Sequence, residues 1–181
     1  MLVGGRSSRM GRDKALLPFR GCPLAKWVAA AVAQSAGAAT LVGSPELYSG
    51  VGFPVISDLF PGEGPLGGIL TALRHSTAEW NLIVACDMPE IHAALLVRLL
   101  DAARQSEADA LLPVTEEGRP QPLCAVYRRT SLTPFETAFS AGTRKVTAAL
   151  AGIRCVRLPV EEVSQFQNVN TPEDWAAYAP G

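Results

Sequence analysis

The sequence predicts an α/β fold in one domain, with a mainly parallel central sheet and helices on both faces. Short apolar runs alternate with longer helical stretches along the chain, which is the pattern of such folds. The 181 residues are enough for one well-packed domain and too few for two comfortable ones. Hydrophobic residues make up 48% and charged residues 18%, so the composition is that of a globular core and argues against disorder.

The first half of the chain gives two helices and several short strands. Residues 16–21 are expected to form a short strand and turn. A helix is expected from Pro23 to about residue 34, because proline suits a first helical turn and Gly37 lies just beyond the end. A second helix is expected over residues 66–75, directly after a Gly-Pro turn. Apolar runs typical of buried parallel strands lie at residues 1–3, 39–42 and 55–57.

The second half continues the alternation. Residues 81–85 are the strongest strand candidate, and this apolar run leads directly to Asp87. Residues 93–103 are predicted to be helical because their leucines repeat on one side. A last helix is predicted to be capped by residues 171–174 and to reach residue 178. The remaining elements are expected to be strands at residues 110–114, 123–127 and 154–158, and helices at residues 132–140 and 145–150.

Charge and hydropathy exclude several classes of partner. The formal net charge is −1, so the chain has no global field that would gather nucleic acid or an anionic membrane. No apolar stretch is long enough to span a membrane. Residues 1–3 lack the basic region and apolar run of a signal peptide. We therefore expect a cytoplasmic protein that binds neither nucleic acid nor membrane.

The four cysteines are expected to be buried, reduced thiols. They are widely spread and contain no C-x-x-C pair, which argues against both a zinc ribbon and a redox dithiol. The cysteine beside Asp87 has no basic or histidine partner next to it in the sequence, so no catalytic thiol is expected. The four are Cys22, Cys86, Cys124 and Cys155.

Residues 3–14 are the most informative run in the chain, reading Val-Gly-Gly-Arg-Ser-Ser-Arg-Met-Gly-Arg-Asp-Lys. Glycines such as Gly4 and Gly5 let the backbone approach an anion with its N–H groups. Arg9 and Lys14 add positive charge where phosphates would lie. The run fits neither the P-loop nor the dinucleotide fingerprint. We interpret it as a loop that binds a nucleoside triphosphate, and the alternative is a surface loop rich in small residues.

Asp87 is the predicted metal ligand. It follows the strand predicted at residues 81–85, and ligands of open α/β sheets bind outside the carboxyl ends of the strands. Mg²⁺ prefers a few carboxylate oxygens together with substrate phosphates and water. We therefore expect Asp87 to bridge the protein to a triphosphate through Mg²⁺. The alternative is that Asp87 caps the turn before Pro89.

The run over residues 2–14 resembles the signature L-x-G-G-x-S-x-R-M-G-x-D-K of molybdenum cofactor guanylyltransferases, which are nucleotidyltransferases. Residues 64–68, 86–89 and 168–174 also match, and the resemblance extends to about Trp175. It implies a single Rossmann-like nucleotidyltransferase domain over residues 1–181. The implied reaction transfers GMP from GTP to the terminal phosphate of molybdenum–molybdopterin cofactor, forming the guanine dinucleotide cofactor and pyrophosphate.

The resemblance also implies roles for particular residues. Arg9, Lys14 and Asp87 would be catalytic, with Asp87 holding Mg²⁺. Asp58 would help to bind the guanine nucleotide, since a carboxylate can accept hydrogen bonds from guanine N1–H and the exocyclic amine. Asp58 could instead contact the ribose or cap its own loop. The implied nucleotide site comprises Leu2, Val3, Gly4, Gly5, Lys14, Asp58 and Asp87.

The second substrate needs anchors of its own. Asn168 and Asn170 match asparagines near the pterin, whose mixed donors and acceptors suit amide side chains. The alternative for both is turn formation before the last helix. Arg144 and Lys145 resemble a basic pair that meets the molybdopterin substrate, and on the residues alone they are an exposed basic turn. One departure is Gly43, because relatives often have an asparagine after the second strand.

Three other functions stay open at this stage. The same fold serves cytidylyltransferases, which would make the cytosine form of the cofactor, and sugar-phosphate nucleotidyltransferases. The Gly4-Gly5 pair and the Cys-Asp-Met-Pro segment favour guanylyl transfer. A protein that binds GTP and delivers the cofactor without catalysis is the third alternative, and the presence of Lys14 and Asp87 argues against it. Molybdoenzyme apo-proteins or their chaperones are the expected recipients of the product.

Overall fold

The computed structural model describes residues 1–4, 13–176 and 178. The helices are α1 (Leu24–Ala36), α2 (Pro45–Tyr48), α3 (Pro65–His75), α4 (Ala93–Arg104), α5 (Leu132–Ser140), α6 (Val146–Ala149) and α7 (Pro172–Ala176). The strands are β1 (Pro18–Phe19), β2 (Cys22–Pro23), β3 (Leu41–Gly43), β4 (Val55–Ser57), β5 (Trp80–Val84), β6 (Ala110–Val114), β7 (Cys124–Arg128) and β8 (Cys155–Pro159). Single 3₁₀ turns are η1 (Lys14–Leu16), η2 (Ser49–Val51), η3 (Arg129–Ser131), η4 (Leu150–Gly152) and η5 (Val163–Phe166).

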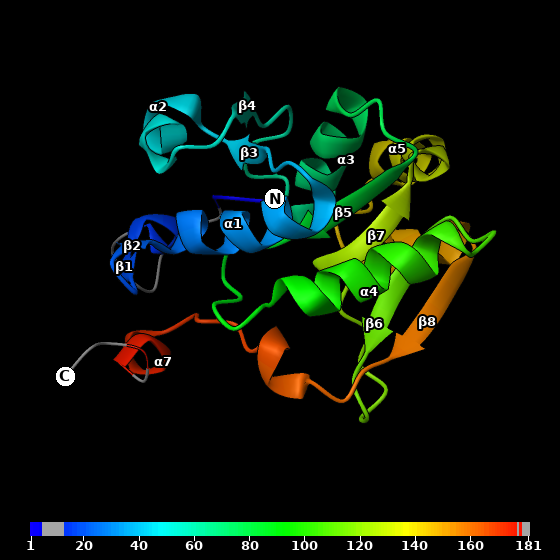
Figure 1. Cartoon of the computed structure of the whole chain (residues 1–181). Coiled ribbons are helices and arrows are strands. Elements are labelled where there is room, and N and C mark those ends of the chain that lie inside the picture. Colours follow the sequence, from blue (N-terminus) through cyan, green and yellow to red (C-terminus); the bar gives the residue numbers. More distant parts are fainter. Residues whose placement is uncertain (5–12, 177, 179–181) are drawn as a thin grey trace.

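The central sheet has two parts that the first residues join (Figure 1). Leu2 forms parallel bridges to Val42 on β3 and to Ala85 just after β5, so the order is β4-β3-(residues 1–3)-β5-β7-β6-β8. Strand β7 is antiparallel to both of its neighbours, whereas β3 with β4 and β6 with β8 pair in parallel. The prediction of a mainly parallel sheet is confirmed, with β7 as its exception.

Helices cover both faces of the sheet, as predicted. Successive side chains of a strand point to opposite faces. On β7, Cys124 and Val126 belong to the core that α1 and α4 cover, whereas Ala125 and Tyr127 belong to the core under α3, α5 and α6. The leucines predicted to face inward from α4 are all buried. The α/β prediction therefore holds for layers as well as for elements (Figure 1).

Helix α1 ends where the sequence indicated. Gly37 follows Ala36 with φ of 83°, a left-handed conformation that an L side chain rarely adopts. Its N–H donates to the carbonyl oxygen of Ala33 at 2.9 Å, which satisfies one of the unpaired carbonyls at the end of the helix. Glycine at this position is therefore required by the turn that leads into β3.

Several segments differ from the prediction, most of them short. The expected strand and turn over residues 16–21 is the β1–β2 hairpin, in which Arg20 and Gly21 have φ of 47° and 83°. A 3₁₀ turn, η1, precedes it and was not predicted. Asp13 caps this turn, because its Oδ1 accepts the N–H of Ala15 at 3.0 Å. Helix α2 was also not predicted, since four residues are too few to show a helical period.

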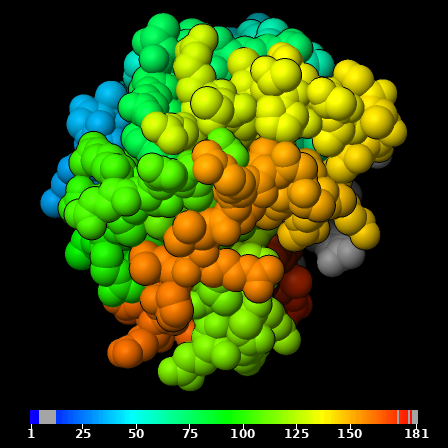
Figure 2. All heavy atoms as spheres, turned by 90° about the vertical axis from the view of Figure 1, so that its right-hand side faces the viewer, coloured from blue at the N-terminus to red at the C-terminus, as the bar shows by residue number. Residues whose placement is uncertain are grey.

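Strand β8 lies at one edge of the sheet, and Figure 2 shows it in orange across the surface. Its first three residues are exposed, including Val156 at 41%. None of the helices within the described residues is both long and apolar enough to cross a membrane.

The prediction that all four cysteines are buried is confirmed for two of them. Cys86 and Cys124 are buried, and burial raises the pKa of each thiol to about 12. Both therefore stay protonated at neutral pH. Cys22 is half-buried in the hairpin and Cys155 is exposed on the edge strand, so the expectation of burial was wrong for these two.

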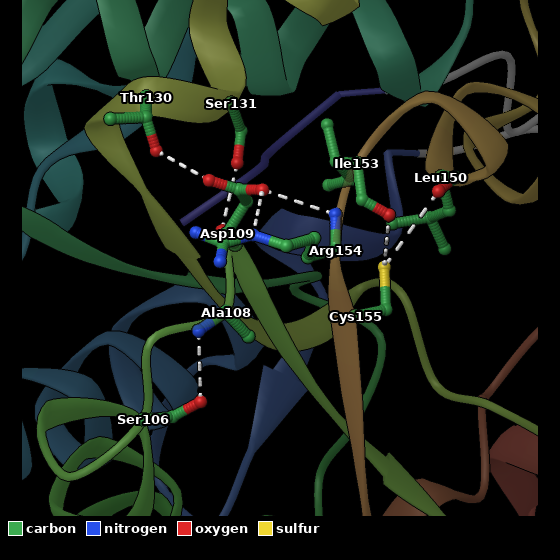
Figure 3. A network of polar contacts seen from close by, with 9 residues as sticks. All are labelled: Ser106, Ala108, Asp109, Thr130, Ser131, Leu150, Ile153, Arg154 and Cys155. Atoms are coloured by element: carbon green, nitrogen blue, oxygen red, sulfur yellow. Dashed lines mark hydrogen bonds and ion pairs between the residues drawn. The ribbon is translucent and has the colours of Figure 1, made fainter.

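A polar network fastens the starts of β6 and β8 (Figure 3). The Asp109 carboxylate accepts the hydroxyl of Thr130 at 2.9 Å and the N–H of Arg154 at 3.0 Å. The Asp109 carbonyl accepts the hydroxyl of Ser131 at 2.8 Å. Burial raises the pKa of Asp109, but the hydrogen bonds from Arg154 and Thr130 outweigh it and hold this pKa below its usual value. The network lies at the amino ends of these strands, away from the edge where ligands of such sheets bind.

Candidate active site

A cleft of about 1030 Å³ lies along the carboxyl ends of the first strand, β3, β4 and β5. This is the edge of an α/β sheet at which ligands bind. Seven of the residues predicted from the sequence line it. They are Leu2, Val3, Gly4, Lys14, Asp58, Asp87 and Asn170.

Close packing of glycines shapes the wall of the cleft. A Cβ on Gly68 would lie 3.2 Å from Cδ2 of Leu2, so the glycine lets α3 approach the first strand. A Cβ on Gly43 would lie 2.8 Å from Cγ2 of Val3 and 2.9 Å from the Val3 carbonyl oxygen. Real Cβ atoms do not come so close, so the backbone can take this path only with glycine at position 43.

Lys14 joins the two predicted halves of the site. Its Nζ lies 2.9 Å from Oδ2 of Asp87, which follows β5, and donates to Oδ1 of Asn170 at 3.0 Å. The side chains of Lys14 and Asp87 are each 18% exposed, so solvent screens this ion pair less than a surface pair. Lys14, the predicted triphosphate ligand, thus contacts both the predicted metal ligand Asp87 and the predicted pterin ligand Asn170.

The second oxygen of Asp87 fits a metal ligand. Its Oδ1 is buried and has no hydrogen-bond partner among the described residues. A buried polar atom left without a partner costs roughly 1–3 kcal/mol, and more if charged, which a bound cation would remove. The described ranges contain no group of three or more His, Cys, Asp or Glu side chains suited to a metal. The role of Asp87 as a Mg²⁺ ligand stays a prediction.

Asp58 lines the cleft and also caps its own loop. Its Oδ1 accepts the N–H of Phe60 at 2.9 Å, and the hydroxyl of Thr71 lies 3.0 Å from the same oxygen. The capping alternative is thus correct. It does not exclude a nucleotide contact, because both of these bonds use one carboxylate oxygen. The contact of Asp58 with base or ribose stays a prediction.

The structure does not bring Asn168 into this cleft. Asn168 is exposed and lines a separate hollow of about 350 Å³ together with Gln167, Asp174 and Tyr178. Asn170, two residues later, is held by the side chain of Asp174, whose Oδ2 accepts the Asn170 N–H at 2.9 Å. A role of Asn168 toward the second substrate stays a prediction.

The basic pair is also outside the residues that line the cleft. The Arg144 guanidinium forms an ion pair with Glu63 and lies 4.0 Å from the ring centroid of Phe139. Lys145 is exposed and immediately precedes α6. The Arg144 carbonyl oxygen lies 3.8 Å from where a Cβ on Gly64 would be, so the backbone of this turn runs beside the rim of the cleft. The proposed contact of Arg144 and Lys145 with the cofactor substrate stays a prediction.

Two predicted residues, Gly5 and Arg9, lie outside the described residues. The structure describes the two ends of the glycine loop. Gly4 has φ of 94° at one end, and Lys14 stands in η1 at the other. Both ends line the cleft.

Tyr48 is a site residue for which the sequence patterns gave no role. It is 2% exposed, lines the cleft from α2, and donates its hydroxyl hydrogen to Oδ2 of Asp13. Burial, followed by the hydrogen bond to Asp13, raises the pKa of the Tyr48 phenol, so it stays protonated at neutral pH. The sequence offers one sign of this contact, because Asp13, next to Lys14, is a residue type that commonly caps helices.

An open α/β sheet whose strand ends carry a glycine-walled cleft, a lysine and a half-buried carboxylate is suited to binding a nucleotide, as in enzymes that transfer phosphoryl or nucleotidyl groups. The sequence model of the MobA-like NTP transferase domain matches residues 1–156, and the chain belongs to this family. It is thus a nucleotidyltransferase, as the sequence predicted.

Molybdenum cofactor guanylyltransferases are similar to this chain over nearly its whole length. The molybdenum cofactor guanylyltransferases of Cupriavidus metallidurans and Xanthomonas euvesicatoria pv. vesicatoria are 32% and 37% identical to it. The alignments cover 96% and 97% of this chain, respectively, and 90% of each relative. The crystal structure of molybdopterin-guanine dinucleotide biosynthesis protein A from Archaeoglobus fulgidus superposes with a TM-score of 0.83 at 30% identity, and the match covers 98% of this chain and 94% of that one.

The fold also occurs in more distant transferases. The 2-C-methyl-D-erythritol 4-phosphate cytidylyltransferase of Thermus thermophilus superposes with a TM-score of 0.73 at 19% identity, covering 98% of this chain and 95% of that one. At this identity the likeness shows the fold alone.

Proposed function

We propose that this chain transfers GMP from GTP to the terminal phosphate of molybdenum–molybdopterin cofactor, giving the guanine dinucleotide cofactor and pyrophosphate. The observation that supports this most directly is the contact of Lys14 with both Asp87 and Asn170. Transfer requires the phosphates of two substrates to meet, and Lys14 lies between the residues proposed for each substrate. The guanylyltransferases to which the chain is similar support the same reaction.

Catalysis of this reaction depends on positioning the two substrates and stabilising negative charge, and not on a general base. A phosphate oxygen of the cofactor attacks the α-phosphorus of GTP in line, an O–P bond forms, and the bond to pyrophosphate breaks. The attacking phosphate is already ionised at neutral pH, so no general base is required. Lys14 and Arg9, with the backbone amides around Gly4 and Gly5, would hold the triphosphate and oppose its negative charge.

Mg²⁺ is the cofactor in this proposal, and Asp87 would hold it. When bound, it would neutralise charge on the α-phosphate and on the departing pyrophosphate. The Asp87 carboxylate is already oriented by the protein, because Lys14 forms an ion pair with Oδ2. Its buried Oδ1 would then bind the metal. The ion pair thereby fixes the orientation of the carboxylate before the nucleotide arrives.

Asp58 would select guanine in this proposal. The hydrogen bonds found for its carboxylate in the described part of the chain both go to Oδ1, which leaves Oδ2 for the nucleotide. A carboxylate oxygen can accept from the N1–H and amine donors of guanine, and cytosine lacks that pair. A molybdoenzyme apo-protein or its chaperone as recipient, and the cytoplasm as location, stay predictions from the sequence.

The test is product identification with GTP and CTP in parallel, using the purified chain, Mg²⁺ and molybdenum–molybdopterin cofactor. We expect the guanine dinucleotide and one pyrophosphate per product from GTP, with little product from CTP. Product from CTP in preference to GTP would assign the chain to cytidylyl transfer. Binding of GTP without any product would instead support a delivery protein that does not catalyse transfer.

A further inference from the structure

Tyr48 lies beside both described ends of the glycine loop. A Cβ on Gly4 would be 3.5 Å from the phenol oxygen, so the phenol stands next to the residue where the loop begins. Its hydroxyl donates to Oδ2 of Asp13, where the loop ends. The phenol is 2% exposed, so its polar atom is buried and needs the partner that Asp13 provides.

Asp13 transmits this contact to Lys14. Its second oxygen, Oδ1, accepts the N–H of Ala15 at 3.0 Å and so caps η1, the single turn that carries Lys14. Ala15 is fully buried, which anchors that turn against the core. The ammonium group of Lys14 then reaches Asp87 and Asn170 at 2.9 and 3.0 Å.

We propose that Tyr48 is a positioning residue, which through Asp13 sets where the Lys14 ammonium lies. The role of Lys14 toward the triphosphate rests on the proposed function, whereas the contacts from Tyr48 to Lys14 do not. Tyr48 touches neither Lys14 nor Asp87 by a hydrogen bond in the described residues, so it acts through Asp13.

The alternative is that Tyr48 only fills the core. Tyr127 offers a matched control, because it too is fully buried and its hydroxyl donates to a backbone carbonyl, that of Pro122, at 2.7 Å. Tyr127 belongs to the core on the other face of the sheet and does not line the cleft. Tyr48→Phe and Tyr127→Phe each remove one buried hydroxyl, and only the first removes a contact to Asp13.

The first experiment needs no substrate. The rate at which an amine-specific acylating reagent modifies Lys14 is measured by mass spectrometry in the free protein. The hydrogen bond to the Asp13 carboxylate is charge-assisted and its loss is worth about 1.5 kcal/mol, so Tyr48→Phe is expected to raise the rate about tenfold. Tyr127→Phe should leave it unchanged. Equal rates for Tyr48→Phe and the wild type would overturn the proposal.

The second experiment measures kcat/KM for GMP transfer. Tyr48→Phe is expected to lower it about tenfold, since the lost hydrogen bond is charge-assisted, while Tyr127→Phe changes it little. The double variant Tyr48→Phe/Asp13→Ala should have the same kcat/KM as Asp13→Ala alone, because Tyr48 acts through Asp13. If the two single-variant losses in kcat/KM multiply in the double variant, Tyr48 does not act through Asp13. If the wild type itself shows no transfer, the proposed function fails, and the labelling experiment still decides the role of Tyr48.

Discussion

Gly43→Ala tests the packing that brings the first strand and Tyr48 to the cleft. An added Cβ would lie 2.8 Å from Cε2 of Tyr48, 2.8 Å from Cγ2 of Val3 and 2.9 Å from the Val3 carbonyl oxygen. A side chain could rotate away from such a contact, but the carbonyl belongs to the centre of the sheet. Overpacking at well-packed positions costs about 1–3 kcal/mol, and the backbone clash places this substitution in the upper part of that range.

The assay is thermal unfolding by calorimetry. For a chain of this length, about 1 kcal/mol corresponds to a shift of roughly 2–4 °C in Tm, so a loss near 2.5 kcal/mol predicts a fall of about 5–10 °C. Gly50→Ala is the control, because a Cβ there meets no atom of the described residues within 4 Å and its φ is not positive. Its Tm should be unchanged or slightly higher, since alanine restricts the unfolded chain. A Tm of Gly43→Ala equal to that of the wild type would refute the packing argument.

Three further predictions follow from particular contacts. Lys14→Met should weaken GTP binding by roughly 10- to 100-fold in calorimetric titration, because a charge-assisted contact is lost, and an unchanged Kd would exclude the triphosphate role. Asp109→Asn should lower the free energy of unfolding by about 1 kcal/mol at pH 7. Because the folded-state pKa of Asp109 lies below its usual value of 3.8, this deficit should shrink as the pH falls below that value, and a constant deficit in acid denaturant titrations would contradict it. Alkylation of the native protein should modify exposed Cys155 well before buried Cys86 and Cys124, and early labelling of either buried thiol, read by mass spectrometry, would be against the structure.

The fold could be predicted where a pattern was long enough to repeat. The leucines of α4 and the Pro23 and Gly37 boundaries of α1 placed two helices within two residues of their ends. The direction of β7 was missed, because an apolar run looks the same whichever way the strand runs. The short connection from β6 to β7 did carry that information, since parallel neighbours need a longer crossover.

The candidate site was predictable where residues directly follow strands. Asp58 and Asp87 reach the cleft because β4 and β5 end there. Tyr48 was not predictable, since its partner Asp13 lies 35 residues away and α2 is too short for a pattern. Asn170 and not Asn168 reaches Lys14, because the bond from Val169 N–H to the Asp87 carbonyl at 3.0 Å fixes the path of the backbone beside β5.

The most direct test of nucleotidyl transfer in this cleft is pyrophosphate release from GTP by Asp87→Asn in the presence of Mg²⁺ and molybdenum–molybdopterin cofactor. The control is Asp101→Asn, an exposed carboxylate on α4 that pairs with Arg104. We expect a fall of at least about a hundredfold for Asp87→Asn, because the charge on the proposed metal ligand is removed, and no change for the control. Release by Asp87→Asn at the wild-type rate would contradict the assignment of this cleft as the site of nucleotidyl transfer.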